Sequence, residues 1–360
     1  MVAKFDTLYL MTSNTSRRQI LKSVGAAAIT APFIHGANKS DSAKLRLGAG
    51  AYQYEATHDW GELPASIKYG NTHGIVEDSH GRFYVFHTVH KTSVKPDAMV
   101  VFDAKGKFVT SWGSEFAGGA HGLHIQKEGG TEYLYLCDTK RSVVVKTTLD
   151  GKVLLTLGYP KESEKYKQDK DGKALVKYTP TNLAVASNGD IFVGDGYGSS
   201  YINKYSKDGK FIKTFGGGKN KEAGSTNSPH GIFIDARSGT EELVVADRSN
   251  NRLQYFSLDG AHLRFVTEDM ALPCHFSLRK DLMLIPDLGA RVLVLDKNNK
   301  LVANLGDDSK SEWRKTRVMD RDKFTAGKFV APHGACFDHK GNIFVSEWVE
   351  VGRITKLRKV

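Results

Sequence analysis

Histidine is the residue whose pattern in this sequence points most directly to chemistry. Five histidines stand at equivalent places before short apolar segments, and Asn182 occupies a sixth such place: they are His73, His121, His230, His275 and His333. Three imidazoles that converge and leave one coordination position open describe a catalytic zinc site. Imidazole also suits copper, iron and nickel, so the ligand type favours zinc without fixing the metal.

A second interpretation of the same histidines involves no metal. In it, Pro-His-Gly is a recurring turn, and each imidazole bonds a neighbouring backbone carbonyl. For one histidine alone we would prefer that interpretation. Because the pattern recurs at five equivalent places, we favour a metal site.

Two further motifs carry groups that could act beside such a metal. Tyr197 lies in Asp195-Gly196-Tyr197, and Arg248 lies in Ala246-Asp247-Arg248. A tyrosine next to a divalent cation has a lowered pKa and can serve as a base. An arginine there can hold a carboxylate through two parallel hydrogen bonds. We interpret Asp195 and Asp247, and likewise Asp138 and Asp287, as residues that tie turns.

A repeat runs through the chain and supplies the elements that must position these side chains. One unit has four short apolar segments, at residues 72–76, 81–86, 98–103 and 108–112, the last of which ends at Gly113. The six openings given above recur at intervals of roughly 45 to 61 residues, which is typical of propeller blades with four strands. The longer intervals contain polar inserts at residues 161–177 and 307–328, which we expect to be surface loops.

The sequence therefore predicts an all-β, six-bladed β-propeller of the NHL type, with four antiparallel strands per blade, over residues 44–360. The last unit stops after its third strand, at residues 353–357, and a segment at residues 52–60 resembles a fourth strand. We expect that N-terminal strand to complete the sixth blade and close the ring, which leaves no exposed sheet edge there.

This architecture selects three of the histidines as metal ligands. The first strand of each blade lines the central channel, so the residue that opens it faces the channel mouth. His121, His230 and His333 belong to blades two, four and six and are spaced evenly around the axis, whereas His73, Asn182 and His275 are additional channel residues. Strand alternation places His124 on a different face from His121.

The N-terminal residues 1–43 are predicted to be an export signal and linker. Residues 16–22 read Ser-Arg-Arg-Gln-Ile-Leu-Lys, and an apolar stretch of signal-peptide length follows at residues 24–34. This twin-arginine pattern predicts a periplasmic or extracellular protein, or a membrane-anchored one if the signal stays uncleaved. No other segment is apolar and long enough to span a bilayer.

Composition narrows the classes of partner. The net charge is +11, but Lys and Arg are interleaved with Asp and Glu, which indicates a solvated basic surface rather than nucleic-acid binding. Cys137, Cys274 and Cys336 form no metal or disulfide motif, so buried free thiols are expected. The partner that fits is a small-molecule or peptide substrate, and the sequence leaves the oligomeric state open.

Most of residues 60–358 resembles the lyase domain of the peptide-amidating enzymes, peptidyl-α-hydroxyglycine α-amidating lyase. The resemblance lies in an ordered set of motifs: His121-Gly122-Leu123, Asp195-Gly196-Tyr197, Pro229-His230, Ala246-Asp247-Arg248 and Pro332-His333. It implies a six-bladed propeller whose zinc is held by three histidines, with Tyr197 as the catalytic base and Arg248 orienting the substrate. The implied reaction breaks a C–N bond and gives an amide and glyoxylate.

Three positions depart from the family pattern. Thr88 stands where the family has an arginine, Ala331 where it has a methionine, and Gly334 where it has an aspartate that contacts calcium. The resemblance is thus closer for the metal than for the substrate, and calcium binding is in doubt. Two other functions remain open: a non-catalytic propeller that binds a protein or glycan on its channel face, and an electron-transfer or oxidase protein.

Overall fold

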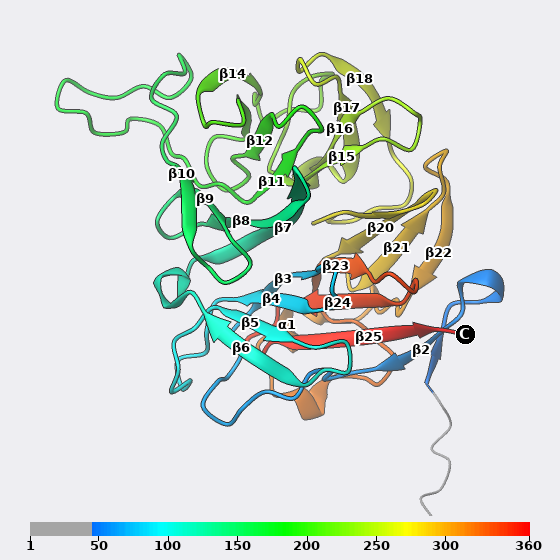
Figure 1. The fold of residues 1–360 in the computed structure, drawn as a ribbon. Helices are drawn as coiled ribbons and strands as arrows, with labels where there is room; N and C mark the ends of the chain where they lie inside the picture. Colours follow the sequence, from blue (N-terminus) through cyan, green and yellow to red (C-terminus); the bar gives the residue numbers. More distant parts are fainter. Residues whose placement is uncertain (1–44) are drawn as a thin grey trace, which may run out of the picture. The chain divides into compact units, whose positions relative to one another are not determined.

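Residues 45–360 are described by a computed structural model, in which they form six β-sheets arranged as the blades of a propeller (Figure 1). The predicted signal and linker at residues 1–43, with the twin arginines, lie outside the described residues. The predicted six-bladed fold with four antiparallel strands per blade is confirmed.

The strands follow one another blade by blade. Blade one contains β3 (Thr72–Glu77), β4 (Phe83–His87), β5 (Met99–Phe102) and β6 (Phe108–Trp112), and blade two contains β7 (Ala120–Glu128), β8 (Thr131–Asp138), β9 (Val143–Thr147) and β10 (Val153–Leu157). Blade three contains β11 (Asn182–Val185), β12 (Ile191–Gly194), β13 (Tyr201–Tyr205) and β14 (Phe211–Gly216), and blade four contains β15 (Pro229–Asp235), β16 (Glu242–Asp247), β17 (Arg252–Phe256) and β18 (His262–Val266). Blade five contains β19 (Ser277–Arg279), β20 (Leu282–Asp287), β21 (Arg291–Leu295) and β22 (Leu301–Leu305). Blade six contains β23 (Pro332–Phe337), β24 (Ile343–Glu347), β25 (Arg353–Lys359), β2 (Tyr54–Thr57) and β1 (Arg46–Leu47).

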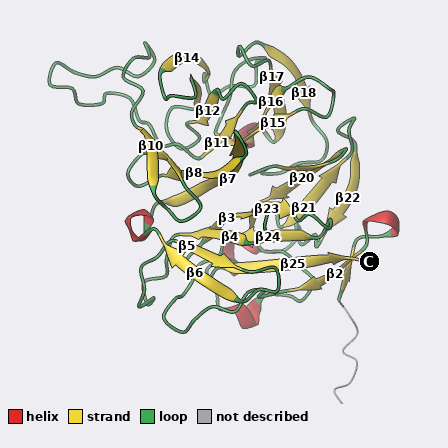
Figure 2. Ribbon diagram, in the orientation of Figure 1, coloured by secondary structure: helices red, strands yellow, loops and turns green. Residues whose placement is uncertain are grey.

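Helical structure within residues 45–360 is confined to short turns (Figure 2). These are η1 (Gly50–Tyr52), η2 (Ser114–Phe116), η3 (Arg248–Asn250), α1 (Trp313–Thr316) and η4 (Arg321–Lys323). In this described part of the chain, no helix has the length and apolar character needed to cross a membrane.

The ring closes where the two ends of the propeller meet in blade six. Strand β2 pairs antiparallel with β25, with Tyr54 opposite Lys359 and Thr57 opposite Lys356, and Figure 1 shows the blue strand beside the red one. This confirms the predicted closure by an N-terminal strand. The short strand β1 adds a fifth, outermost strand that the repeat did not predict, because the other blades have none.

The hydrophobic core lies between neighbouring blades. The inner strands are buried on both faces, whereas outer strands such as β6 are largely exposed or half-exposed. Side chains of adjacent blades pack together, as Tyr84 and Met99 of blade one do with Leu123 and Leu134 of blade two. Each sheet is therefore sandwiched between two others, which explains why the inner strands read as continuous apolar runs.

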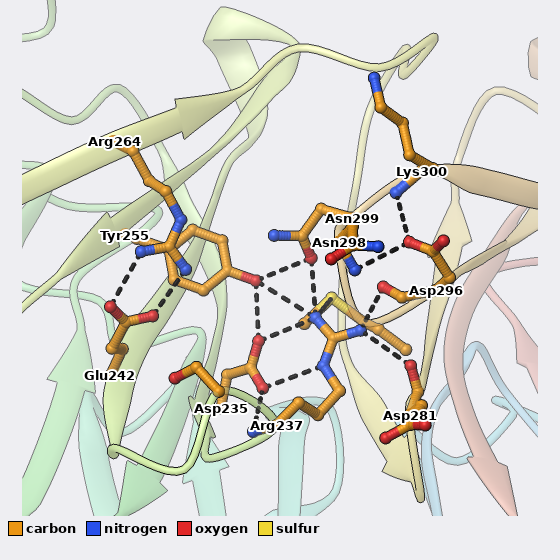
Figure 3. A network of polar contacts seen from close by, with 12 residues as sticks. Asp235, Arg237, Glu242, Tyr255, Arg264, Asp281, Asp296, Asn298, Asn299 and Lys300 are labelled. Atoms are coloured by element: carbon orange, nitrogen blue, oxygen red, sulfur yellow. Dashed lines mark hydrogen bonds and ion pairs between the residues drawn. The ribbon is translucent and has the colours of Figure 1, made fainter.

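Polar contacts also join blades, at the end of the strands opposite the predicted metal site. Figure 3 shows Arg237 of blade four donating to Asp235 within its own blade and to Asn299 in blade five, at 2.8 and 2.7 Å. Tyr255 donates to Asp235 at 2.8 Å. The guanidinium is thus balanced by a carboxylate and spans two blades, so it fixes their relative position at that face.

Ring closure should contribute strongly to stability, and Tyr54 tests this. Its side chain is 1% exposed and packs in the core between blades five and six. We expect Tyr54→Ala to lower the free energy of unfolding by about 3–5 kcal/mol, as measured by chemical denaturation, because it leaves a cavity at the closing strand. The matched control is Val109→Ala on the outer strand of blade one, where the side chain is 47% exposed. A change at Val109 as large as that at Tyr54 would contradict the prediction.

Candidate active site and metal centre

Three histidines from alternate blades meet at the channel mouth. His121 on β7, His230 on β15 and His333 on β23 form an equilateral triangle, with 4.8 Å between each pair of ring centroids. The three side chains, the histidine triad from here on, are at most 4% exposed. The structure thus brings together the three residues that the sequence singled out as ligands.

Each triad imidazole is anchored to the backbone of the next blade through Nδ1. The contacts are His121 to the Thr181 carbonyl at 2.7 Å, His230 to the Cys274 carbonyl at 2.9 Å, and His333 to the His73 carbonyl at 3.0 Å. Because a carbonyl oxygen only accepts, each Nδ1 must carry the hydrogen. The tautomer is therefore set, and every Nε2 carries the lone pair that binding a metal would require.

The glycine after each triad histidine is what lets the acceptor carbonyl come so close. A Cβ at Gly122 would lie 2.5 Å from the Thr181 oxygen, and one at Gly231 would lie 2.5 Å from the Cys274 oxygen. At Gly334 the distance to the His73 oxygen would be 2.4 Å. His-Gly is therefore one structural unit, in which the glycine admits the carbonyl that the imidazole binds.

A β-bulge directs each triad side chain. Strand register shifts between Ala120 and Leu123, between Pro229 and Ile232, and between Pro332 and Gly334, so each His-Gly unit sits in a bulge. Bulges change the direction in which a side chain points and interrupt strand alternation. The recurring-turn interpretation and the metal interpretation are consequently compatible, because the carbonyl bond occupies Nδ1 and leaves Nε2 free.

Burial keeps the triad uncharged. Desolvation lowers the pKa of His121 to about 3, and it lowers the pKa values of His230 and His333 well below 6.5. Arg248, close to all three, acts in the same direction. Neutral imidazole is the form that binds a metal, so these residues suit a divalent cation at neutral pH.

His73 and Cys274 also offer ligand atoms, and the two clusters that they form share His333, while neither contains all three triad histidines. Potential ligand atoms of His73, His121 and His333 lie within 4.8 Å of one another, and so do those of His230, Cys274 and His333. His73 Nδ1 is 3.4 Å from His333 Nε2. Burial raises the pKa of Cys274 to about 12, so it is a neutral thiol, and the three cysteines are buried and free as predicted.

Tyr197 and Arg248 join the triad from blades three and four. The Tyr197 hydroxyl lies 3.2 Å from His121 Nε2 and 3.1 Å from His230 Nε2. Arg248 donates from Nη1 to the Tyr197 oxygen and from Nη2 to Ser228, both at 3.4 Å. Burial raises the pKa of Tyr197, and the Arg248 charge opposes that rise.

Carboxylates at or directly after the ends of the second strands fix the backbone near these two residues. Asp195 accepts hydrogen bonds from the Thr179 and Ser199 amides, both at 2.6 Å, and Asp247 accepts one from the Asn227 amide at 2.7 Å. Asp138 and Asp287 likewise bind backbone amides at 2.7–2.9 Å. The predicted structural role of these four residues is confirmed.

Two other predicted channel residues stay outside the triad. His275 precedes β19 instead of opening it and lines a cavity of about 130 Å³ farther along the channel. The Asn182 side chain accepts a hydrogen bond from the Leu183 amide at 2.8 Å. His124 lines the same cavity as His275, and its ring packs edge-on against Phe233 of blade four.

Sequence reasoning missed several residues around the site. Thr181, Cys274 and Ser228 act through backbone or hydroxyl groups, which carry no motif of their own. Arg317, in the insert between β22 and β23, lies near enough to His73 to lower its pKa. The insert has no repeat pattern, so its length and polar composition indicated a surface loop and did not single out Arg317.

Two of the positions that depart from the amidating-lyase pattern have local explanations. Thr88 accepts a hydrogen bond from the Asn71 amide at 3.0 Å, and Gly334 has no side-chain oxygen that could bind a cation.

The fold belongs to a class represented among solved structures. A streptogramin B lyase structure superposes with a TM-score of 0.56 at 14% identity, covering 86% of this chain and 99% of that one. No protein-family model matches the chain. At this level of identity, the likeness shows the shared propeller fold alone.

Sequence relatives narrow the class further. The chain is 28% identical to peptidyl-alpha-hydroxyglycine alpha-amidating lyase 1 of Drosophila melanogaster over 246 residues, which are 61% of this chain and 42% of that protein. It is 24% identical to a probable lyase of the same name from Caenorhabditis elegans over 324 residues, covering 81% of this chain and 84% of that protein. The chain is thus a propeller similar to amidating lyases, and it spans about two fifths of the length of the fly relatives.

The His-Gly unit can be tested without removing a ligand. We expect Gly231→Ala to weaken zinc binding about 10–100-fold, because the new Cβ collides with the carbonyl that anchors His230. Gly158→Ala is the matched control, since nothing lies within 4 Å of a Cβ there. Zinc affinity measured by competition with a chelator should fall in Gly231→Ala and His230→Ala and stay unchanged in Gly158→Ala. Equal affinity in all four proteins, the unmodified chain included, would disprove the anchoring role.

Proposed function

We propose that this chain is a metal-dependent carbon–nitrogen lyase that acts on N-acyl-α-hydroxyglycine compounds. The observation that carries the proposal is the Tyr197 hydroxyl, which lies within 3.2 Å of two triad nitrogens and within 3.4 Å of Arg248. A potential base, two neutral imidazoles and a guanidinium therefore meet at the Tyr197 oxygen, and the His333 ring lies beside both of those imidazoles. The names of the sequence relatives support the same reaction class.

Zinc is the metal we propose for the histidine triad. Three imidazoles that leave a position open for substrate match a catalytic zinc site, although copper and iron also accept imidazole. Calcium is not proposed, because it prefers oxygen ligands and the grouped side chains of the described channel offer nitrogen and sulfur. When bound, the divalent cation would supply Lewis acidity that lowers the pKa of the substrate hydroxyl and of Tyr197.

The residues of the chain would then move one proton. Tyr197, as the phenolate, accepts the proton of the α-hydroxyl group, while the positive charge of Arg248 stabilises the phenolate beforehand. The hydroxyl oxygen forms a C=O double bond as the C–N bond breaks and its electrons pass to nitrogen. Tyr197 returns the proton to that nitrogen, so the products are an amide and glyoxylate.

Replacing Tyr197 should separate the chemistry from metal binding. We expect Tyr197→Phe to lower kcat for an N-acyl-α-hydroxyglycine about 10²–10⁴-fold, because the general base is lost. Zinc content should stay unchanged, since all three triad residues remain. Glyoxylate release measures the rate, and Tyr201→Phe in the same blade, where the half-buried hydroxyl makes no contact with the triad, is the control. Full activity in Tyr197→Phe, or no glyoxylate from the unmodified protein, would refute the lyase proposal.

We also propose export through the twin-arginine pathway, which rests on residues 16–22 alone. Such export would place the lyase in the periplasm or outside the cell. We expect replacement of Arg17 and Arg18 by lysine to retain the protein in the cytoplasm of a bacterial host with this pathway, as judged by fractionation. Arg46→Lys, outside the motif, should leave export unchanged, and unimpaired export of the double variant would argue against this route.

A further inference from the structure

The insert between β22 and β23 brings a second guanidinium to the channel mouth. Arg317 directly follows α1, and its Nη2 donates to the Asn71 side-chain oxygen at 3.2 Å, two residues before His73. Its charge also lowers the pKa of His73, the imidazole that contacts His333. Arg317 therefore lies close to His73, at the end of the blades where the triad lies, and comes from a different part of the chain from Arg248.

Arg317 has no carboxylate partner within residues 45–360. Its other hydrogen bond runs from Nε to the Trp348 carbonyl at 3.1 Å, so both acceptors are neutral. Arg252, by contrast, pairs with Asp247 at 2.7 Å, whereas Arg248 resembles Arg317 in having only neutral acceptors, Tyr197 and Ser228. Burial lowers the pKa of Arg317, and the exposed Glu350 opposes this without forming an ion pair. A half-buried cation without a counter-ion is costly, and a bound anion would remove that cost.

Trp348 gives the guanidinium a fixed orientation. The Arg317 Cζ atom lies 3.4 Å from the centroid of the indole, as expected for stacking. Trp348 follows β24 just as Arg248 follows β16, so both occupy the place directly after a second strand, at the same end of their blades as the triad. Stacking holds the planar fork in place, and Nη1 makes no bond within the described residues.

We propose that Arg317 and Trp348 form the site that recognises the substrate's carboxylate, with the guanidinium binding its two oxygens. This assignment rests on the proposed function for the identity of the carboxylate. The proposal gives the two arginines different roles. Arg248 donates to Tyr197 and Ser228, whereas Nη1 of Arg317 is available to bind the substrate. The insert between β22 and β23 then contributes a residue to substrate recognition.

The test uses a ligand that cannot react. N-benzoylglycine has the carboxylate but no α-hydroxyl group, and N-benzoylglycinamide is its neutral counterpart. Calorimetric titration of the purified full-length chain should show Arg317→Gln binding N-benzoylglycine about 10–100-fold more weakly than the unmodified chain, since a charge-assisted pair is lost. Arg317→Lys keeps the charge but loses the planar pair of donors, so its affinity for N-benzoylglycine should lie between those of the unmodified chain and Arg317→Gln. This variant provides the test if Arg317→Gln does not fold.

Arg314→Gln is the matched control, because that arginine is exposed in the same insert and stacks on Trp313 instead. It should bind N-benzoylglycine normally, and the neutral amide should bind the unmodified chain and Arg317→Gln equally. Unchanged binding of N-benzoylglycine by both Arg317 variants, equal losses for acid and amide, or no binding by the unmodified chain would overturn the proposal.

The outcome also separates this site from the lyase reaction. If glyoxylate release is observed, Arg317→Gln should raise KM with little change in kcat, because Arg317 does not touch the reacting atoms. If no glyoxylate forms while N-benzoylglycine binding still depends on Arg317, the carboxylate site stands and the reaction does not. If turnover occurs with the same KM in Arg317→Gln, the reaction stands and this site does not.

Discussion

The structure depends on one repeated interaction: a buried histidine in one blade donates through Nδ1 to a backbone carbonyl of the next blade. It occurs from His121, His230 and His333, so it ties three pairs of blades together at the channel axis. The same bond fixes the tautomer that frees Nε2 for a metal. The same hydrogen bonds therefore join the blades and orient the imidazoles for a metal. Both effects require glycine after each histidine, because a Cβ there would collide with the carbonyl.

Burial has opposite consequences for the two kinds of residue in this site. It keeps the triad imidazoles neutral, which favours metal binding, and it raises the pKa of Tyr197, which disfavours the phenolate that a base must become. Arg248 opposes the second effect and reinforces the first, because its charge disfavours imidazolium and favours phenolate. The guanidinium at the Tyr197 oxygen thus favours both the neutral imidazoles and the phenolate in the same buried site.

Periodic features of this protein could be predicted from the sequence, and aperiodic ones could not. The recurring openings located all six blades, and the missing strand after residue 357 predicted the pairing of β2 with β25. The bulges that direct the triad side chains could not be predicted, because a bulge leaves no periodic trace in the sequence. Arg317 was missed because its insert has no counterpart in the other blades, so no repeat predicts where it returns to the channel.

The division between even and odd blades explains why five histidines in sequence become three in the triad. Blades two, four and six contribute imidazoles, whereas blades three, five and one contribute the carbonyls that anchor them. A carbonyl is supplied by any residue type, so the side chains at the odd openings are free to differ. Asn182 and His275 accordingly follow the acceptor residues Thr181 and Cys274 and turn to other contacts. His73 both supplies its carbonyl and keeps its ring against the triad, which makes blade one the place where the threefold pattern is broken.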